Sequence, residues 1–249
     1  MSGHNKWSTI KHKKGKTDAQ KGKVFTKIGR EIMIAIKEGG GGDPSTNSKL
    51  RDVIAKAKAA NMPNDNIQRS IKKASGEGEG ANYKEIMYEG YGVGGVAVLV
   101  EVVTDNLNRS ASEVRHIFDK CGGSLGASGC VAYMFERKGV IVLDNIKKLD
   151  EEELMMVALD AGASDVEVED DSCVIYTEPN DFSAVRENLE KGGFAFLSAD
   201  RAMIPGNTVT VDDPELVAKV EKLLDMLEDN DDVQNVYHNA DLPEEEEEE

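Results

Sequence analysis

Apolar residues recur at helical spacing in the first third of the chain. From Asp18 onward they follow one another at three- and four-residue steps, which predicts an amphipathic helix: Val24, Phe25, Ile28, Ile32, Ala35 and Ile36. Glycines 39–42 are expected to end it. Two shorter amphipathic helices follow, one starting near Asp43-Pro44 and one after Asn61-Met62-Pro63. The pattern therefore begins with three helices.

The period then changes to that of strands. Residues 86–91 and 96–104 read as two strands, residues 110–121 as a helix and residues 130–135 as a third strand. Gly90, Gly92 and Gly95 match the spacing of a dinucleotide-binding fingerprint. That fingerprint must open a helix, whereas here it leads into a strand. A hairpin turn is the better interpretation.

Residues 138–205 alternate as strand, helix, strand, strand, helix and strand, which is the ferredoxin-like order. A strand at 208–211, a helix at 216–227 and a strand at 232–238 then supply the pieces that the 84–135 region lacks. We therefore expect an α+β protein: an N-terminal three-helix domain followed by two ferredoxin-like α/β-sandwich domains, the third inserted in the second.

Four segments are expected along the chain. They are a basic helical domain at 1–76, a middle α+β domain formed by 81–136 plus 206–240, an inserted ferredoxin-like domain at 137–205, and a disordered acidic tail at 241–249. The linker around Gly76–Gly80 marks the first boundary.

Charge divides the chain at the same linker. Residues 1–75 hold 17 Lys and Arg against 6 Asp and Glu, a net charge of +11, whereas the remainder carries −28. Such asymmetry is typical of one nucleic-acid-facing module on an acidic scaffold, although basic faces are often merely solvated.

The candidate nucleic-acid-binding residues lie in this basic region. An arm with few apolar residues precedes the first helix, and Trp7 within it either stacks on a base or packs on that helix. The candidates are Lys6, Trp7, Lys11, His12, Lys13, Lys14, Lys16, Lys21, Lys23, Lys27, Arg30, Lys56, Lys58, Arg69, Lys72 and Lys73. The loop Asn61, Met62 and Pro63 either packs back on the core or offers Met62 to a partner.

Several classes of function find no support in the sequence. No apolar run reaches the roughly 20 residues of a membrane span, and the charged N-terminus is unlike a secretory signal. Cys121, Cys130 and Cys173 read as reduced thiols of a cytoplasmic protein. Since no catalytic, phosphate-loop or metal-binding motif occurs, we expect no enzyme, catalytic residue, metal, cofactor or small-molecule substrate.

Several rare strings occur in order and resemble the YebC/PmpR family over about residues 1–240, including its mitochondrial members that resemble the translational activator of cytochrome c oxidase subunit I. The matching strings are Gly3-His4-Asn5-Lys6-Trp7, Asp18-Ala19-Gln20-Lys21-Gly22-Lys23, Ala60-Asn61-Met62-Pro63, Tyr88-Glu89-Gly90-Tyr91-Gly92 and Thr104-Asp105-Asn106. The resemblance implies three domains and no enzyme. It also implies one of two roles, DNA-binding transcriptional regulation or ribosome-associated translational activation that relieves stalling at proline-rich stretches.

Three functions follow from these observations. The first is a monomeric RNA-binding regulator of translation that docks on ribosomal RNA, because the arm lacks a clean base-reading helix. The alternative is a DNA-binding transcriptional regulator. The third is a partner-binding scaffold that contacts no nucleic acid.

Overall fold

The computed structural model describes residues 18–76, 83–144, 151–168 and 172–243. Residues 77–80 of the Gly76–Gly80 linker and the acidic residues 244–249 lie outside these ranges. The chain divides into two compact units. Unit 1 comprises residues 1–34, 79–136 and 205–249, and unit 2 comprises residues 35–78 and 137–204.

Unit 1 is built on a sheet of strand order β3-β1-β2-β9. Its strands are β1 (Lys84–Tyr91), β2 (Ala97–Thr104), β3 (Ser124–Leu125) and β9 (Val233–His238). β2 is central and pairs antiparallel with both β1 and β9. Because β9 comes from the last part of the chain, the sheet is complete only after the chain returns from unit 2.

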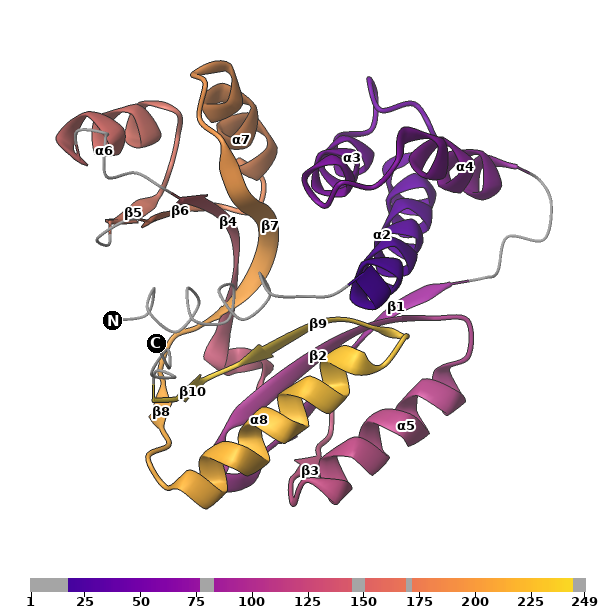
Figure 1. The fold of residues 1–249 in the computed structure, drawn as a ribbon, viewed down its shortest axis with the longest axis vertical. Coiled ribbons are helices and arrows are strands. Elements are labelled where there is room, and N and C mark those ends of the chain that lie inside the picture. Colours follow the sequence, from indigo (N-terminus) through magenta and orange to yellow (C-terminus); the bar gives the residue numbers. More distant parts are fainter. Residues whose placement is uncertain (1–17, 77–82, 145–150, 169–171, 244–249) are drawn as a thin grey trace. The chain divides into compact units, whose positions relative to one another are not determined.

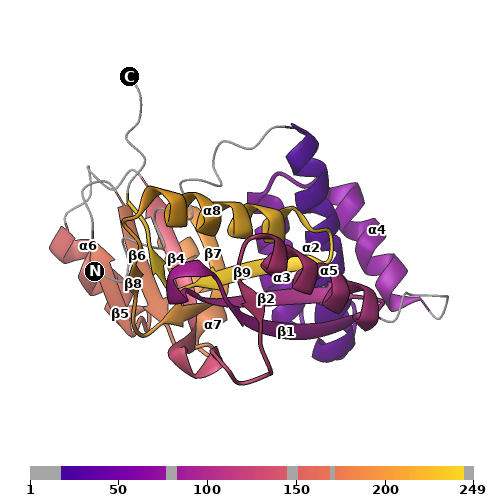
Figure 2. The ribbon, with the colours of Figure 1, turned by 90° about the horizontal axis from the view of Figure 1, so that it is seen from below.

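Two helices of unit 1 cover one face of this sheet (Figures 1 and 2): α5 (Leu107–Lys120) and α8 (Pro214–Asp229). Their apolar stripes meet alternate residues of β2 in one core, which includes Val98, Val100, Phe118 and Leu223, each at most 1% exposed. This burial is the main source of stability for the unit. Asp213 caps α8 by accepting from the N–H groups of Glu215 and Leu216, and Pro214 follows at the first helical position.

The predicted hairpin turn is confirmed. Residues 93–95 form a short 3₁₀ turn between β1 and β2, and Gly94 and Gly95 have φ of 71° and 78°. Glycine adopts this left-handed region without the steric cost that other residues meet.

Unit 2 contains the inserted α+β domain. Its sheet has the order β5-β6-β4-β7, formed by β4 (Phe135–Asp144), β5 (Asp165–Val168), β6 (Ser172–Thr177) and β7 (Phe196–Pro205). The helices α6 (Glu151–Asp160) and α7 (Phe182–Lys191) pack with this sheet in a second core (Figure 1). The α+β class and the insertion of the third domain are therefore as predicted.

The three N-terminal helices are present: α2 (Asp18–Gly39), α3 (Ser48–Ala59) and α4 (Asn64–Ser75). α2 ends at Gly39, where a Cβ atom would lie only 2.1 Å from the side chain of Asn47. Asn47, 2% exposed, caps α3 by accepting from the Leu50 N–H and donates to the Ala35 and Gly41 carbonyls. The predicted start of this helix at Asp43-Pro44 is wrong, because Asp43 instead closes a turn with Ser45 and Thr46.

The predicted strand at 130–135 is also wrong. Residues 132–134 form a 3₁₀ turn, and β4 begins only at Phe135. The cause is the carboxylate of Glu89, 4% exposed, which accepts hydrogen bonds from the N–H groups of Gly129, Val131 and Ala132 at 2.6, 2.9 and 2.8 Å. Because those N–H groups donate to a side chain, they are not available to pair with a neighbouring strand.

The same carboxylate makes the stability of this loop dependent on pH. Burial raises the pKa of Glu89, but the three backbone hydrogen bonds and one from Ser128 outweigh it and leave the pKa below its usual value. A lowered pKa stabilises the fold above the unfolded pKa, and that contribution is lost as the pH falls through the folded value.

We therefore expect Glu89→Gln to loosen residues 126–134 by about 1.5–3 kcal/mol at neutral pH, since a carboxylate acceptor becomes an amide. Hydrogen exchange of this loop measures the effect. In the wild type the protection declines in acid, and in the variant that decline is absent. Glu85→Gln, on an exposed part of the same strand, is the control and should behave as the wild type. An equal acid response in both variants would contradict the assignment to Glu89.

Candidate nucleic-acid interface

The predicted binding residues fall into three groups in the structure. Seven lie outside the described residues: Lys6, Trp7, Lys11, His12, Lys13, Lys14 and Lys16. The backbone of Lys21 belongs to α2, but its side chain also lies outside the description. The side chains of the remaining eight cations belong to the described part of the chain.

Three cations of α2 are engaged by unit 1 itself. The ammonium of Lys23 lies 2.5 Å from a carboxylate oxygen of Asp229, and Lys27 donates to the carbonyl of Glu228 at 2.7 Å. These partners form the C-terminal end of α8, where unpaired carbonyls and the helix dipole attract cations. The hydrogen bond to Asp229 raises the pKa of Lys23 above its usual value.

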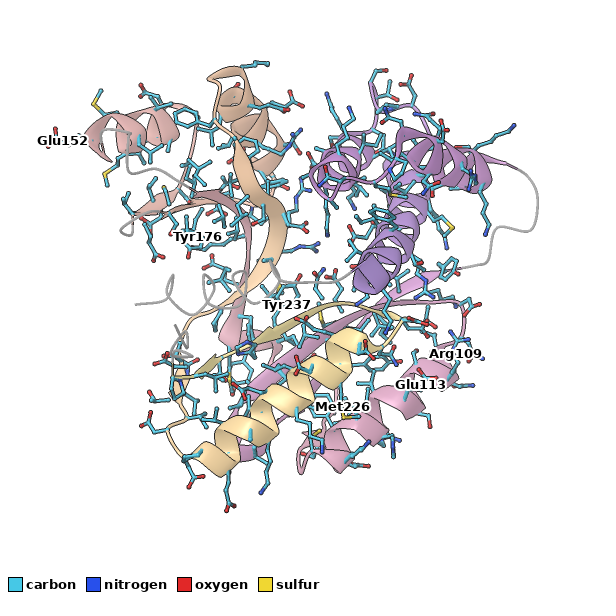
Figure 3. All side chains as sticks on the ribbon, viewed as in Figure 1. Arg109, Glu113, Glu152, Tyr176, Met226 and Tyr237 are labelled. Carbon is cyan, nitrogen blue, oxygen red and sulfur yellow. The ribbon has the colours of Figure 1, made fainter. Side chains whose placement is uncertain are left out.

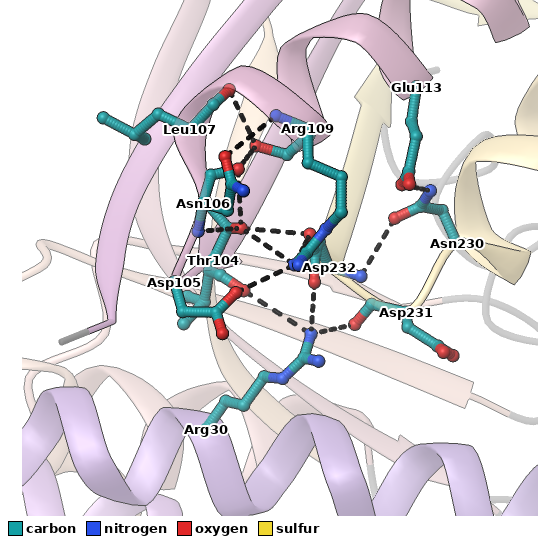
Figure 4. Close-up of polar contacts among 12 residues, drawn as sticks. Arg30, Thr104, Asp105, Asn106, Leu107, Arg109, Glu113, Asn230, Asp231 and Asp232 are labelled. Atoms are coloured by element: carbon teal, nitrogen blue, oxygen red, sulfur yellow. Dashed lines mark hydrogen bonds and ion pairs between the residues drawn. The ribbon is translucent and has the colours of Figure 1, made fainter. Parts of the chain in front are cut away.

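Arg30, the third of these cations, reaches a buried carboxylate (Figure 4). It donates to the Asp231 carbonyl and, at 3.1 Å, to a carboxylate oxygen of Asp232, which is 3% exposed. The other oxygen of Asp232 accepts from Arg109 at 2.7 Å and from the Thr104 hydroxyl at 3.0 Å. The hydrogen bond to Asp232 is the largest cause of the raised pKa of Arg109.

Arg109 and Glu113 project from α5 (Figure 3), and both side chains line an open polar pocket of unit 1. Its remaining lining is Lys23, Arg30, Asp229, Asn230, Asp231 and Asp232. Because cations and carboxylates alternate in this pocket and pair with one another, it offers no excess positive charge to a phosphate. In this structure Lys23, Lys27 and Arg30 therefore attach α2 to other residues of unit 1 and do not form an open cationic surface.

Lys56 of α3 is also engaged, with its ammonium 2.5 Å from a carboxylate oxygen of Asp200 within unit 2. Asp52 on the same helix is buried and joins Arg186 and Arg201 of the inserted domain. α3 is thus held to the inserted domain through buried or partly buried charges.

The last four predicted cations remain open. Lys58 near the end of α3, and Arg69, Lys72 and Lys73 on α4, are exposed. Among the residues that the structure describes, these four side chains form no hydrogen bond or ion pair. Positions 69, 72 and 73 lie on one side of α4, because residues three and four apart are neighbours on a helix. The opposite side buries Ile67, which is 1% exposed. The set Arg69, Lys72 and Lys73 is called the α4 cationic face below, and Lys58 is a separate exposed cation on α3.

The loop between α3 and α4 packs inward. Met62 is 7% exposed, which favours the packing alternative, while Asn61 and Pro63 face solvent. Asn61 has φ of 58°, in the left-handed region that asparagine tolerates better than most residues. A partner contact by this loop stays a prediction.

Other site chemistry is not evident in the described part of the chain. No group of three or more His, Cys, Asp or Glu side chains there could hold a metal ion. None of the helices described is long and apolar enough to cross a membrane. Cys121, Cys130 and Cys173 form no disulfide, and burial raises the pKa of the Cys130 thiol.

Comparison with known proteins gives consistent matches over nearly all of the chain. Residues 5–77 match the family model "TACO1/YebC protein N-terminal domain", and residues 83–240 match "TACO1/YebC second and third domain". A protein of Acetivibrio thermocellus, called a probable transcriptional regulatory protein, is 62% identical over 96% of this chain and 98% of its own length. One of Clostridium novyi with the same description is 62% identical over 98% and 99%.

A solved structure agrees with these relatives. The crystal structure of a conserved hypothetical protein from Aquifex aeolicus is 51% identical and superposes with a TM-score of 0.86, covering 96% of this chain and 98% of that one. Matches of this extent, together with the two family models, show that this chain belongs to the TACO1/YebC family.

Proposed function

We propose that this protein is a non-enzymatic, nucleic-acid-binding regulator of gene expression that acts on translation in the cytoplasm. In this proposal it docks on ribosomal RNA, with relief of stalling at proline-rich stretches as the outcome. The observation that carries the proposal is the α4 cationic face, where three exposed cations find no partner among the described residues. Phosphate neutralisation is the ordinary use of such a face.

The chemistry of the face favours RNA recognised by its shape. Arg69, Lys72 and Lys73 present on a helix surface the cations that phosphate contacts require. Shape and phosphate contacts are the usual means of recognising folded RNA. The basic residues before α2 add further charge along the sequence, while the net −28 of residues 76–249 disfavours a duplex lying across the whole protein.

A DNA-binding transcriptional regulator is the second candidate. It is favoured by the description of the relatives from Acetivibrio thermocellus and Clostridium novyi as probable transcriptional regulatory proteins. A footprint at discrete promoters that survives near-physiological salt would support it over the RNA role.

Charge reversal of the α4 cationic face tests the proposal. We expect the Arg69→Glu/Lys72→Glu/Lys73→Glu variant to lose at least about tenfold in co-sedimentation affinity for ribosomes. Its plot of log affinity against log salt should flatten by about 0.7 to 0.9 for each phosphate contact removed. Failure of the wild type to sediment with ribosomes would overturn the translational role.

The control variant carries the same change in net charge elsewhere. Lys120→Glu/Lys219→Glu/Lys222→Glu alters three exposed lysines of α5 and α8. We expect it to keep ribosome affinity within about threefold, because unspecific long-range attraction is largely screened at physiological salt. Equal losses in both variants would show that the α4 cationic face has no special part in binding.

A further inference from the structure

Exposed apolar side chains gather on one helix of the inserted domain. Five large hydrophobic side chains are exposed in the described part of the chain, and three of them belong to α6. Their exposed fractions are 38% for Met155, 65% for Met156 and 50% for Leu159. Single exposed apolar residues are ordinary, but a contiguous group marks an interaction surface.

The core of unit 2 does not need these three residues. Leu154 and Ala158 form the inner side of α6 and are 2% and 0% exposed. At 100° per residue, positions 155, 156 and 159 lie on the opposite, outer side and neighbour one another at three- and four-residue spacing. α6 is therefore apolar on both sides, and its outer side, formed by Met155, Met156 and Leu159, is called the α6 apolar face below.

Acidic residues predominate around this face in the sequence. Residues 149–185 contain twelve Asp and Glu and no Lys or Arg. Glu152 and Asp160 lie one helical turn before and after Met156, and Glu152 projects from the outer end of α6 (Figure 3). The α6 apolar face thus has an acidic rim.

We propose that the α6 apolar face is a docking site for a Lys- and Arg-rich amphipathic helix of another protein. Apolar anchors of such a helix would cover Met155, Met156 and Leu159, while its cations would meet the carboxylates of the rim. The two methionines suit this use because their flexible, polarizable side chains adapt to different anchors. This surface is separate in sequence and charge from the α4 cationic face.

The charge of the rim selects this partner over the alternatives. A nucleic acid would bring phosphates against carboxylates. A second copy of this chain, using the same face, would bring two acidic rims together, and like charges at an interface cost several kcal/mol. A cationic helix alone satisfies both the apolar residues and the rim.

The test is an anisotropy titration of the full chain with a fluorescein-labelled 18-residue peptide of Leu and Lys, patterned with leucines on one helical side. We expect Met156→Glu/Leu159→Glu to weaken peptide binding about tenfold or more. Since this variant adds negative charge, simple electrostatic attraction would strengthen binding instead, so unchanged or tighter binding overturns the proposal.

Matched controls locate the effect. Leu107→Glu/Tyr133→Glu adds the same charge at two exposed apolar residues of unit 1 and should bind within about twofold of the wild type. A peptide of the same composition with a scrambled pattern should bind at least about tenfold more weakly. Circular dichroism should show that Met156→Glu/Leu159→Glu is folded, and its ribosome affinity should stay at the wild-type level, which separates this proposal from the nucleic-acid role.

Photo-crosslinking in cells identifies the natural occupant. A benzophenone amino acid at position 156 should form a crosslink to a Lys- and Arg-rich helical segment of another protein, identified as a crosslinked peptide by mass spectrometry. Crosslinks mainly to nucleic acid or to a second copy of this chain would overturn the assignment.

Discussion

Replacing Asp52 by alanine is expected to destabilise unit 2 by about 3–5 kcal/mol. The substitution would leave Arg186 and Arg201 without their buried carboxylate partner. One oxygen of Asp52 accepts from Ser183 at 2.6 Å and from Arg201 at 2.9 Å, and the other lies 3.5 Å from the guanidinium of Arg186. The side chains of Asp52 and Arg186 are only 8% and 6% exposed. Removal of Asp52 would therefore leave the buried positive charge of Arg186 without solvent to compensate it.

The surroundings explain why the remaining contacts do not compensate. Arg186 keeps Glu190 at 3.1 Å, but that carboxylate is 64% exposed and so contributes weakly. Arg201 keeps the Pro179 carbonyl and its position over the Phe182 ring. Neither supplies a second buried negative charge.

Native-state hydrogen exchange on peptides from α3 and α7 measures this loss as a free energy of opening. Glu38→Ala is the control, because the Lys49–Glu38 pair in the same unit is exposed by about half at both ends. Exposed pairs contribute about 0–1 kcal/mol. If both variants lose the same small amount, Asp52 does not hold α3 to the inserted domain.

Replacing Asp232 by alanine is expected to have an effect of the same size on unit 1, again about 3–5 kcal/mol. Asp232 is the only carboxylate among the described residues that contacts both Arg30 and Arg109, and it also accepts from Thr104. Its loss would remove the buried carboxylate that holds Arg30 of α2, while Lys23 and Lys27 would keep their contacts with the end of α8. We expect exchange protection of α2 between residues 22 and 34 to fall with that of β9.

The neighbouring residue supplies the control. Asp231 contacts Arg30 through its carbonyl oxygen, and its side chain is exposed. Asp231→Ala should therefore change the free energy of opening by less than about 0.5 kcal/mol. Equal effects of the two substitutions would show that net negative charge near α2 matters rather than the buried carboxylate.

These two carboxylates also explain how the candidate interface is placed. Asp52 fixes α3, the helix that precedes α4 in the chain, to the inserted domain. Asp232 fixes α2 through Arg30, a cation that the sequence assigns to nucleic acid. A partly unfolded Asp52→Ala protein would lose ribosome affinity through disorder, so the charge-reversal variants are the more direct test of binding.

Much of the secondary structure follows from periodicity alone. Five helices and the central strand β2 bury a stripe or a whole face of apolar residues, and the spacing of these residues in the sequence predicts each element. The helices are α2, α3, α4, α7 and α8. The strand at 130–135 was mispredicted because a side chain 40 or more residues away, Glu89, takes its N–H groups. Hydrogen bonds between residues so far apart in the chain leave no signal in the local sequence pattern.

The sequence by itself determined the α+β class, the insertion of the third domain and the concentration of positive charge before residue 76, because spacing and composition are local properties that survive in any fold. Only the tertiary structure decided which cations are open. Lys23, Lys27, Arg30 and Lys56 look the same in sequence as Lys58, Arg69, Lys72 and Lys73, yet the first four meet acceptors that lie more than 140 residues further along the chain. Whether a charge faces solvent or a carboxylate depends on long-range packing, and no local pattern encodes it.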